Sequence, residues 1–146
     1  MSTVTGYADM AMVGGGVTVF FGPLRDDGTP IAWEDAGASL WFGDSITVEG
    51  RGDVDGDGFD DLAVASTQGS LVSCPEGWYD PECKPGLVYL VAGPQAGVVE
   101  PVDIIQGYGA WGYFGSTMHG SADLDGDGHK DLVAAGGGWV YVLFGV

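Results

Sequence analysis

Short apolar segments bounded by glycine recur along the chain. The three longest follow a Gly-x-Val-Tyr-Val type of pattern: Gly16–Pro23, Gly86–Pro94 and Gly138–Gly145. Two shorter apolar runs, Leu62–Ala65 and Leu132–Ala135, precede the second and third of these segments. Runs of this length that are rich in β-branched and aromatic residues are typical of strands, and almost no stretch has a helical period. The pattern therefore predicts an all-β fold.

An acidic loop occurs twice, each time directly before one of the shorter runs. Asp53–Asp61 and Asp123–Asp131 both read Asp-x-Asp-Gly-Asp-Gly-x-x-Asp. The carboxylates and one backbone carbonyl of each loop can converge on a cation, because the glycines let the chain curl tightly. The predicted metal ligands are Asp53, Asp55, Asp57, Phe59 (carbonyl) and Asp61 in the first loop, and Asp123, Asp125, Asp127, His129 (carbonyl) and Asp131 in the second.

The composition of these loops favours calcium. Two carboxylates about 4 Å apart repel by roughly 4 kcal/mol at an effective dielectric of about 20, so a cluster needs a counter-cation. A flexible ring of oxygens suits Ca²⁺ better than Mg²⁺, and no His or Cys side chain completes a zinc set. An EF-hand would need Glu at position 12, where the chain has Val64 and Ala134. The sequence predicts two Ca²⁺ sites, with a polar Asp/Gly-rich turn as the alternative.

The loops belong to a larger repeat of strand, acidic loop, strand, turn and strand. Trp41–Ser45 and Tyr113–Thr117 each contain Phe-Gly and open a strand that leads into an acidic loop. A degenerate unit precedes them. In it, Ser2–Gly6 can form the opening strand and passes almost directly into Ala8–Val13, so only Asp9 remains of the acidic loop.

Outer fourth strands are predicted at Pro30–Glu34 and Pro101–Ile105, whereas the third unit lacks one. Four-stranded antiparallel sheets that repeat at about fifty residues are typical of β-propeller blades. The sequence therefore predicts about three blades. Their expected boundaries are 1–35 (degenerate, without a calcium loop), 36–107 (with a calcium loop and an insertion) and 108–146 (with a calcium loop, without an outer strand).

At this point the chain resembles the FG-GAP repeats of the integrin alpha-subunit propeller and its bacterial relatives. The resemblance rests on Phe42-Gly43, Phe114-Gly115, both acidic loops and the Gly-bounded strands, and it covers nearly all of residues 2–146. It implies that the eight predicted aspartate ligands of the two loops bind calcium between the first and second strands of a blade. It also implies that partner subunits and ligands dock on the opposite face.

Connections in an antiparallel blade alternate between its two ends, so the insertion 66–85 is expected opposite the calcium loops. Exposed aromatic residues there could anchor a basic protein side chain or stack on a sugar. The predicted ligand-binding residues are Trp78, Tyr79, Tyr108 and Trp111, although Trp111 and Tyr113 could instead pack between blades. Cys74 and Cys83 flank a polar part of the insertion and are predicted to form a disulfide, which would suit an oxidising compartment, with two free thiols as the alternative.

Charge and motif content narrow the function further. The net charge of −17 argues against nucleic acid and anionic membranes as partners, and no apolar run is long enough to insert into a membrane. The first basic residue is Arg25, so the start of the sequence is not expected to be a secretory leader with a positively charged beginning, and we expect a mature or excised segment. Arg51-Gly52-Asp53 matches an integrin-recognition tripeptide, but Asp53 is a predicted metal ligand, so the match is interpreted as accidental. No catalytic constellation is present, and the protein is not expected to be an enzyme.

Three blades pose a problem of closure, because propellers ordinarily close with roughly four to eight. Two chains joined head to tail would give six blades, so a homodimer is expected first and a piece of a longer propeller second. The predicted function is an extracellular or cell-surface module for adhesion or protein recognition. The alternatives are a carbohydrate-binding propeller lectin and a non-catalytic scaffold segment of a larger secreted protein.

Overall fold

A computed structural model describes residues 9–14, 16–23, 26–40, 47–53, 59–69, 84–93, 97–98, 101–108 and 112–145. In these ranges the chain forms eleven β-strands and one short 3-10 helix, η1 (Trp33–Asp35). The predicted all-β fold class is confirmed. No helix in this part of the chain has the length and apolar character that crossing a bilayer requires.

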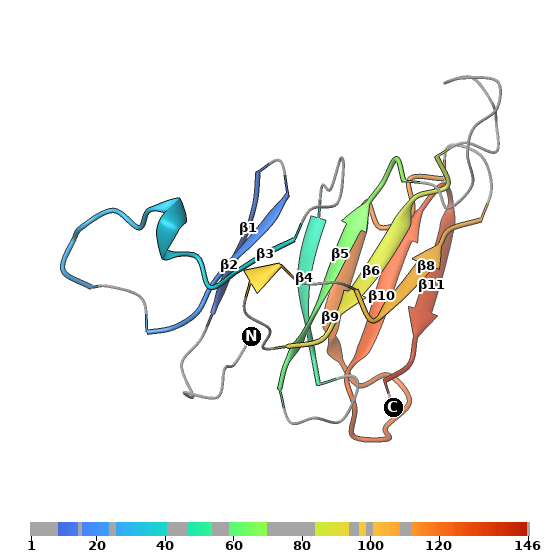
Figure 1. The fold of residues 1–146 in the computed structure, drawn as a ribbon. Helices are drawn as coiled ribbons and strands as arrows, with labels where there is room; N and C mark the ends of the chain where they lie inside the picture. The colour runs from blue at the N-terminus through green and yellow to red at the C-terminus, as the bar shows by residue number, and fades with distance from the viewer. Residues whose placement is uncertain are drawn as a thin grey trace.

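The second sheet lies in the middle of the molecule and has the predicted order of elements (Figure 1). It consists of β4 (Thr47–Gly52), β5 (Asp61–Ser66), β6 (Leu87–Val91) and β8 (Asp103–Gln106). Each neighbouring pair is antiparallel. The outer strand that was predicted after the second Gly-bounded segment is therefore present as β8.

The third sheet repeats this arrangement with one strand fewer. Within the described residues it contains β9 (Thr117–Ala122), β10 (Asp131–Gly136) and β11 (Trp139–Leu143), in the order β11-β10-β9. The acidic loop joins β9 to β10, as predicted. A register shift near Asp131 in the β9–β10 pair matches the shift near Asp61 in the β4–β5 pair, so the repeat extends to backbone detail.

The first sheet differs from the prediction at its outer edge. It contains β1 (Met10–Val13), β2 (Val17–Phe20), β3 (Ala38–Leu40) and β7 (Gly97–Val98), and β7 runs parallel to β3. The prediction of an outer strand at Pro30–Glu34 was wrong, because the chain turns there into η1. Asp35 closes this turn: its Oδ2 accepts a hydrogen bond from the Ala32 N–H at 2.9 Å.

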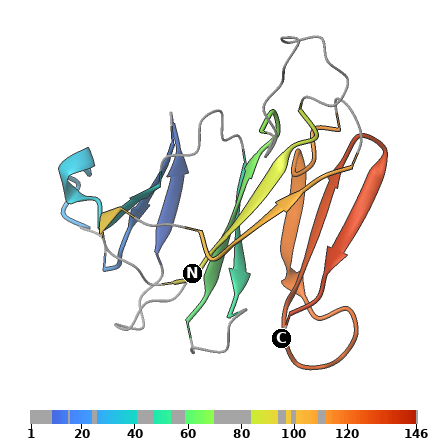
Figure 2. The same ribbon diagram turned by 45° about the vertical axis from the view of Figure 1, so that its right-hand side comes forward.

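The three sheets follow one another and pack face to face through two apolar clusters (Figure 2). One cluster joins the first and second sheets and contains Val17, Val19, Leu62 and Val64. The other joins the second and third sheets and contains buried residues from both: Ala63, Ala65, Val88, Leu90, Phe114, Met118, Leu132 and Ala134. Three successive, similarly built sheets that pack face to face are the arrangement expected of consecutive propeller blades.

The Phe-Gly motif of the third unit lies between the second and third sheets. Phe114 is 1% exposed, and its N–H donates to the Pro85 carbonyl at 3.0 Å. Gly115 has a φ of +83°, and a Cβ there would lie 2.4 Å from the Ala65 Cβ. The motif therefore combines a large buried ring with a residue small enough for close contact between sheets. Phe42-Gly43 lies outside the described residues.

Candidate metal centre

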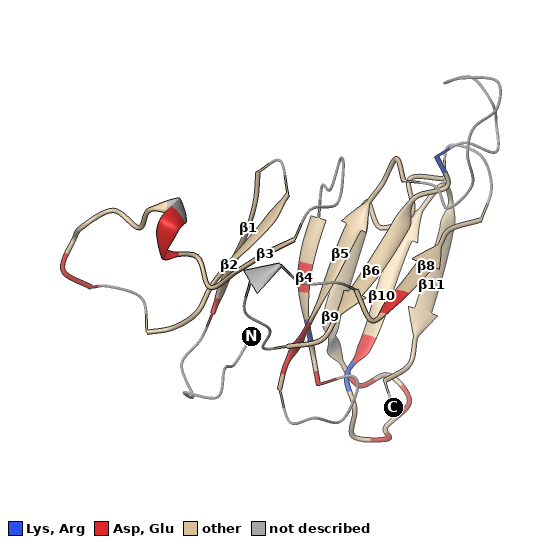
Figure 3. Ribbon diagram, in the orientation of Figure 1, with Lys and Arg blue, Asp and Glu red and all other residues tan. Residues whose placement is uncertain are grey.

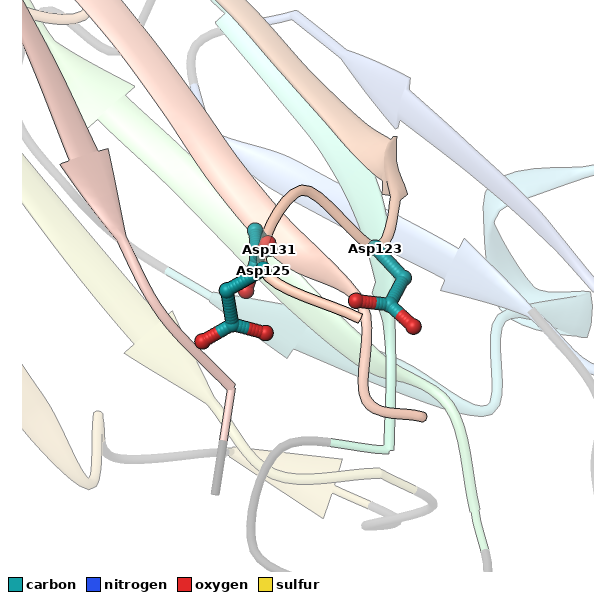
Figure 4. Close-up of side chains that lie close together, drawn as sticks. All are labelled: Asp123, Asp125 and Asp131. Atoms are coloured by element: carbon teal, nitrogen blue, oxygen red, sulfur yellow. The ribbon is translucent and has the colours of Figure 1, made fainter. Parts of the chain in front are cut away.

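The second acidic loop brings three carboxylates together at the junction of β9 and β10. Oxygen atoms of Asp123, Asp125 and Asp131 all lie within 4.8 Å of one another (Figure 4). Asp123 and Asp125 are exposed, whereas Asp131 is 1% exposed at the start of β10. Acidic residues gather on this loop at one end of the third sheet (Figure 3).

Hydrogen bonds within the loop determine its shape. Asp123 accepts from the Gly126 N–H at 2.6 Å through Oδ1 and from the Gly128 N–H at 2.9 Å through Oδ2. Both glycines have positive φ, +82° and +98°, which residues with a Cβ rarely adopt. The backbone therefore curls around the Asp123 carboxylate, and this curl is what the Asp-Gly spacing of the sequence predicted.

Asp131 holds the loop to the strands on either side of it. Its Oδ2 accepts from the Leu124 N–H at 2.6 Å, and its Oδ1 accepts from the Gly145 N–H at 3.0 Å after β11. These two hydrogen bonds, first the one from Leu124, lower the pKa of Asp131 and are assisted by the Arg51 charge. The carboxylate is thus kept ionised, which is the state a cation requires.

The same contact recurs in every sheet. Asp61 accepts from the Gly93 N–H at 2.9 Å, and Asp9 accepts from the Gly22 N–H at 2.9 Å. The last aspartate of the acidic loop therefore joins the start of one strand to the end of the next, with or without an intact loop. This structural role, which sequence reasoning missed, explains why the degenerate first unit keeps Asp9. The signal was the glycine at the matching position of all three units.

The other predicted ligands are placed as follows. Asp127 is not among the three converging carboxylates, and its Oδ1 accepts from the His129 N–H at 2.8 Å. In the first loop, Asp53 and Phe59 are partly buried and Asp61 is 4% exposed. Asp55 and Asp57 lie outside the described residues. The full ligand sets of both loops therefore stay predictions.

The converging group suits a hard divalent cation. All three side chains offer carboxylate oxygens, and such donors bind Ca²⁺ and Mg²⁺ rather than the nitrogen- and sulfur-preferring Zn²⁺. Mutual repulsion of the three charges would be relieved by the ion. Among the predicted residues, Asp123, Asp125 and Asp131 are those that the structure brings together.

Arg51 provides a buried positive charge next to the acidic loops. The side chain is 2% exposed at the end of β4, and its Nη2 donates to the Leu143 carbonyl of β11 at 3.1 Å. Burial lowers the pKa of Arg51, while the nearby charges of Asp61 and Asp131 raise it. Sequence reasoning missed this role. Because Arg51 is buried between two sheets, its burial agrees with the interpretation of Arg51-Gly52-Asp53 as an accidental match.

Aromatic side chains lie at the other end of the sheets. The end of β5, where the insertion begins, is opposite the β9–β10 loop (Figure 1). Tyr108 is 74% exposed; its N–H donates to the Tyr141 hydroxyl at 2.8 Å, and its ring meets Trp139 edge-on at 6.0 Å. Trp139, itself 56% exposed, was not predicted, although it stands where the second unit has Leu87.

The remaining predicted residues of that face lie outside the described part of the chain: Trp78, Tyr79, Trp111, Cys74 and Cys83. Of the four predicted ligand-binding residues, the structure therefore places Tyr108. The ligand-binding surface and the disulfide stay predictions.

Comparisons with known proteins agree with this architecture. The family model described as FG-GAP-like repeat matches residues 53–134, which is more than half of the chain. Integrin alpha-5 of Xenopus laevis is 34% identical over 99 residues, and integrin alpha-V of Gallus gallus is 35% identical over 97 residues. Each match covers 63% of this chain, and the chain spans about 8% of the length of these relatives.

Proposed function

Because the chain belongs to the FG-GAP-like repeat family, we propose that it is a non-catalytic, calcium-stabilised propeller module of the integrin-alpha type. Its proposed setting is extracellular or at the cell surface, where it serves adhesion or protein recognition. The observation that carries the calcium proposal is the convergence of Asp123, Asp125 and Asp131 at the β9–β10 junction. The proposed number of sites is two, one for each acidic loop.

Calcium has a structural role in this proposal. Asp131 already joins β10 to the segment after β11, and an ion shared with Asp123 and Asp125 would add the exposed half of the loop to this connection. Ion binding would thereby be coupled to folding. Extracellular calcium modules commonly have weak sites, with Kd values of roughly 10⁻⁴ to 10⁻³ M.

A melting experiment tests this role. We expect Ca²⁺ at ten times Kd to stabilise the protein, relative to the same protein in chelator, by roughly 1.4 kcal/mol for each occupied site. Asp125→Asn removes one exposed carboxylate of the cluster and should reduce this shift. Asp26→Asn makes the same charge change at an exposed position outside the cluster and should keep it. Equal melting curves of the wild-type protein in Ca²⁺ and in chelator would contradict the proposal.

The recognition surface is proposed at the end of the sheets opposite the acidic loops. Its support is the exposed aromatic pair Tyr108 and Trp139, because such side chains are frequent anchors in protein interfaces. The same pair is compatible with stacking on a sugar, so a propeller lectin is the second candidate. If the protein is a protein-recognition module, Tyr108→Ala should weaken its binding of a basic peptide. A signal on a glycan array that free saccharide competes would favour the lectin.

The third candidate is a non-catalytic scaffold segment of a larger secreted protein, which fits the small share of the relatives' length that the chain spans. In the main proposal, two copies of the chain instead form a homodimer that closes one propeller.

A further inference from the structure

The hairpins of the three sheets can be aligned through their strand pairing. Val17, Val88 and Val140 occupy the same position, because they pair with Val13, Ala65 and Ala135. Val19, Leu90 and Val142 likewise occupy one position, opposite Ala11, Ala63 and Val133. Residues at these positions point to one side of each sheet, because side chains directly opposite in a pair share a face. We call this side the trailing face.

The first two trailing faces are covered by the next sheet. Val17 and Val19 are 1% and 2% exposed and pack with Leu62 and Val64 of the second sheet. Val88 and Leu90 are 0% and 8% exposed and pack with residues of the third. The trailing face of the third sheet is open within the described structure: Val140 is 69% exposed and Val142 is 43% exposed. Two valines that the repeat buries elsewhere are thus exposed here.

The opposite side of each sheet, the leading face, shows the reverse pattern. Met12, Val64 and Ala134 occupy equivalent positions, opposite Thr18, Tyr89 and Tyr141. Val64 and Ala134 are 0% exposed, because each packs against the preceding sheet. Met12 of the first sheet is 45% exposed. Within the described residues, the trailing face of the third sheet is therefore open at Val140 and Val142, and the leading face of the first sheet is open at Met12, whereas Phe20 on that face is 3% exposed.

We propose that the trailing face of the third sheet binds the leading face of the first sheet in a second copy of this chain. This contact would reproduce a junction that the molecule already contains twice, between the first and second sheets and between the second and third. Because the two faces differ, the contact is head to tail and must be made twice to close a dimer. The closed ring would hold six sheets, within the usual range for propellers. The inference rests on the proposed propeller assembly and assigns the surfaces that make it.

The composition of the two faces suits this partner. By the same strand pairing, the trailing face of the third sheet carries Val133, Ala135, Val140 and Val142 together with Thr117 and His119 of β9. The leading face of the first sheet carries Met10, Met12, Thr18, Ser39 and the buried Phe20. Among these described residues, neither face includes Asp, Glu, Lys or Arg. The chain carries a net charge of −17, and two copies repel each other at long range. Uncharged faces allow close contact in spite of this repulsion. Salt should therefore favour the dimer, because it screens repulsion and does not weaken apolar packing.

Sedimentation velocity at micromolar concentration in Ca²⁺ tests the proposal. We expect a wild-type mass about twice the 15.0 kDa of one chain. Val140→Asp on the trailing face and Met12→Asp on the leading face should each lower the measured mass to that of a single chain. Both positions are exposed in the single chain, so both variants should fold. Val102→Asp adds the same charge at a position that is 61% exposed and outside both faces, and it should remain dimeric.

A mixture of the Val140→Asp and Met12→Asp variants tests whether the two faces bind each other. Val140→Asp keeps an intact leading face and Met12→Asp keeps an intact trailing face, so the mixture should form a dimer with one intact contact. A wild-type monomer, dimeric single variants or a mixture that stays monomeric would each overturn the proposal. Failure here is separable from failure of the calcium proposal, because the calcium-dependent melting shift is measured independently on the same wild-type protein.

Discussion

The Asp131 carboxylate accepts hydrogen bonds from the Leu124 and Gly145 N–H groups and also belongs to the three-carboxylate cluster. One side chain thus supports the hairpin and offers an oxygen to a cation. The equivalent Asp9 and Asp61 make the hairpin contact as well. At the scale of single residues, the last aspartate of the loop therefore makes a hydrogen bond that all three sheets share, and the rest of the acidic loop is added to this bond in the second and third units.

The lowered pKa of Asp131 predicts how stability depends on pH without calcium. A carboxyl group whose folded pKa lies below its unfolded value of about 3.9 stabilises the fold above that pH. This contribution is lost as the pH falls through the folded pKa. In chelator, the unfolding free energy of the wild-type protein, measured with urea, should fall between neutral pH and about pH 3. The unfolding free energy of Asp131→Asn should depend less on pH. Identical pH profiles would contradict this explanation.

Arg51 predicts a second effect at this scale. Replacing it with Met leaves Asp61 and Asp131 without their shared cation and removes the bond to the Leu143 carbonyl. Loss of one partner of a direct buried ion pair typically costs about 3–5 kcal/mol of unfolding free energy, which sets the upper end for this longer-range interaction. Chemical denaturation should show a loss of about 1–3 kcal/mol for Arg51→Met, mainly because the Leu143 carbonyl loses its hydrogen bond. Lys84→Met removes the same charge near the other end of the sheets and should change stability by less than about 0.5 kcal/mol.

At the scale of elements, contact between sheets depends on side chains that leave room for a neighbouring backbone. Gly86 lies so close to Phe114 that a Cβ would be 2.4 Å from its backbone nitrogen. The Phe-Gly segment that opens the third unit is therefore seated against the start of β6. Repeated glycines in this chain serve contact between sheets as well as turns.

Gly115→Ala tests this interpretation. The new methyl group would meet the Ala65 Cβ at 2.4 Å in a backbone conformation with φ of +83°. Crowding and strain of this kind typically cost about 1–3 kcal/mol each. We expect a lower melting temperature for Gly115→Ala. Gly50→Ala in β4, where nothing lies within 4 Å of an added Cβ, is the matched control and should be nearly neutral. Equal effects of the two changes would argue against the close contact.

At the scale of the whole molecule, charge opposes compactness. The net charge is −17, and the chain has only four Lys and Arg residues, one of which is the buried Arg51 (Figure 3). Carboxylates on neighbouring loops and strand ends therefore repel one another in the folded state. Bound cations, whether at the proposed calcium sites or diffuse in solution, would reduce this repulsion.

Salt dependence follows from this balance. The Debye length falls from about 30 Å at 0.01 M salt to about 3 Å at 1 M. In chelator, we expect the melting temperature to rise with NaCl, and the extra stabilisation by Ca²⁺ to become smaller as salt increases. Differential scanning calorimetry over this salt range provides the measurement. A melting temperature that falls with salt would show that attractive surface pairs, rather than repulsion, dominate.

Local pattern in the sequence determined the strands of the second and third sheets and the curl of the acidic loop. Apolar runs bounded by glycine specify strands through the conformations of a few neighbouring residues, and the Asp-Gly spacing closes the loop through contacts such as that of Asp123 with Gly126. The all-β class and the repeat were therefore predictable. The same local reasoning failed at Pro30–Glu34, where Asp35 closes a turn and the strand forms later, at Ala38–Leu40.

Only the tertiary structure decided which residues connect the sheets. Arg51 meets a carbonyl that is 92 positions away in the chain, and no pattern near Arg51 specifies that partner. Likewise, Val88 and Val140 have similar neighbours in sequence, yet one is buried and the other exposed. The difference arises because a further sheet covers the first and not the second. Burial of this kind is a property of neighbouring elements in space, so a local pattern predicts the strand but does not specify what lies against it.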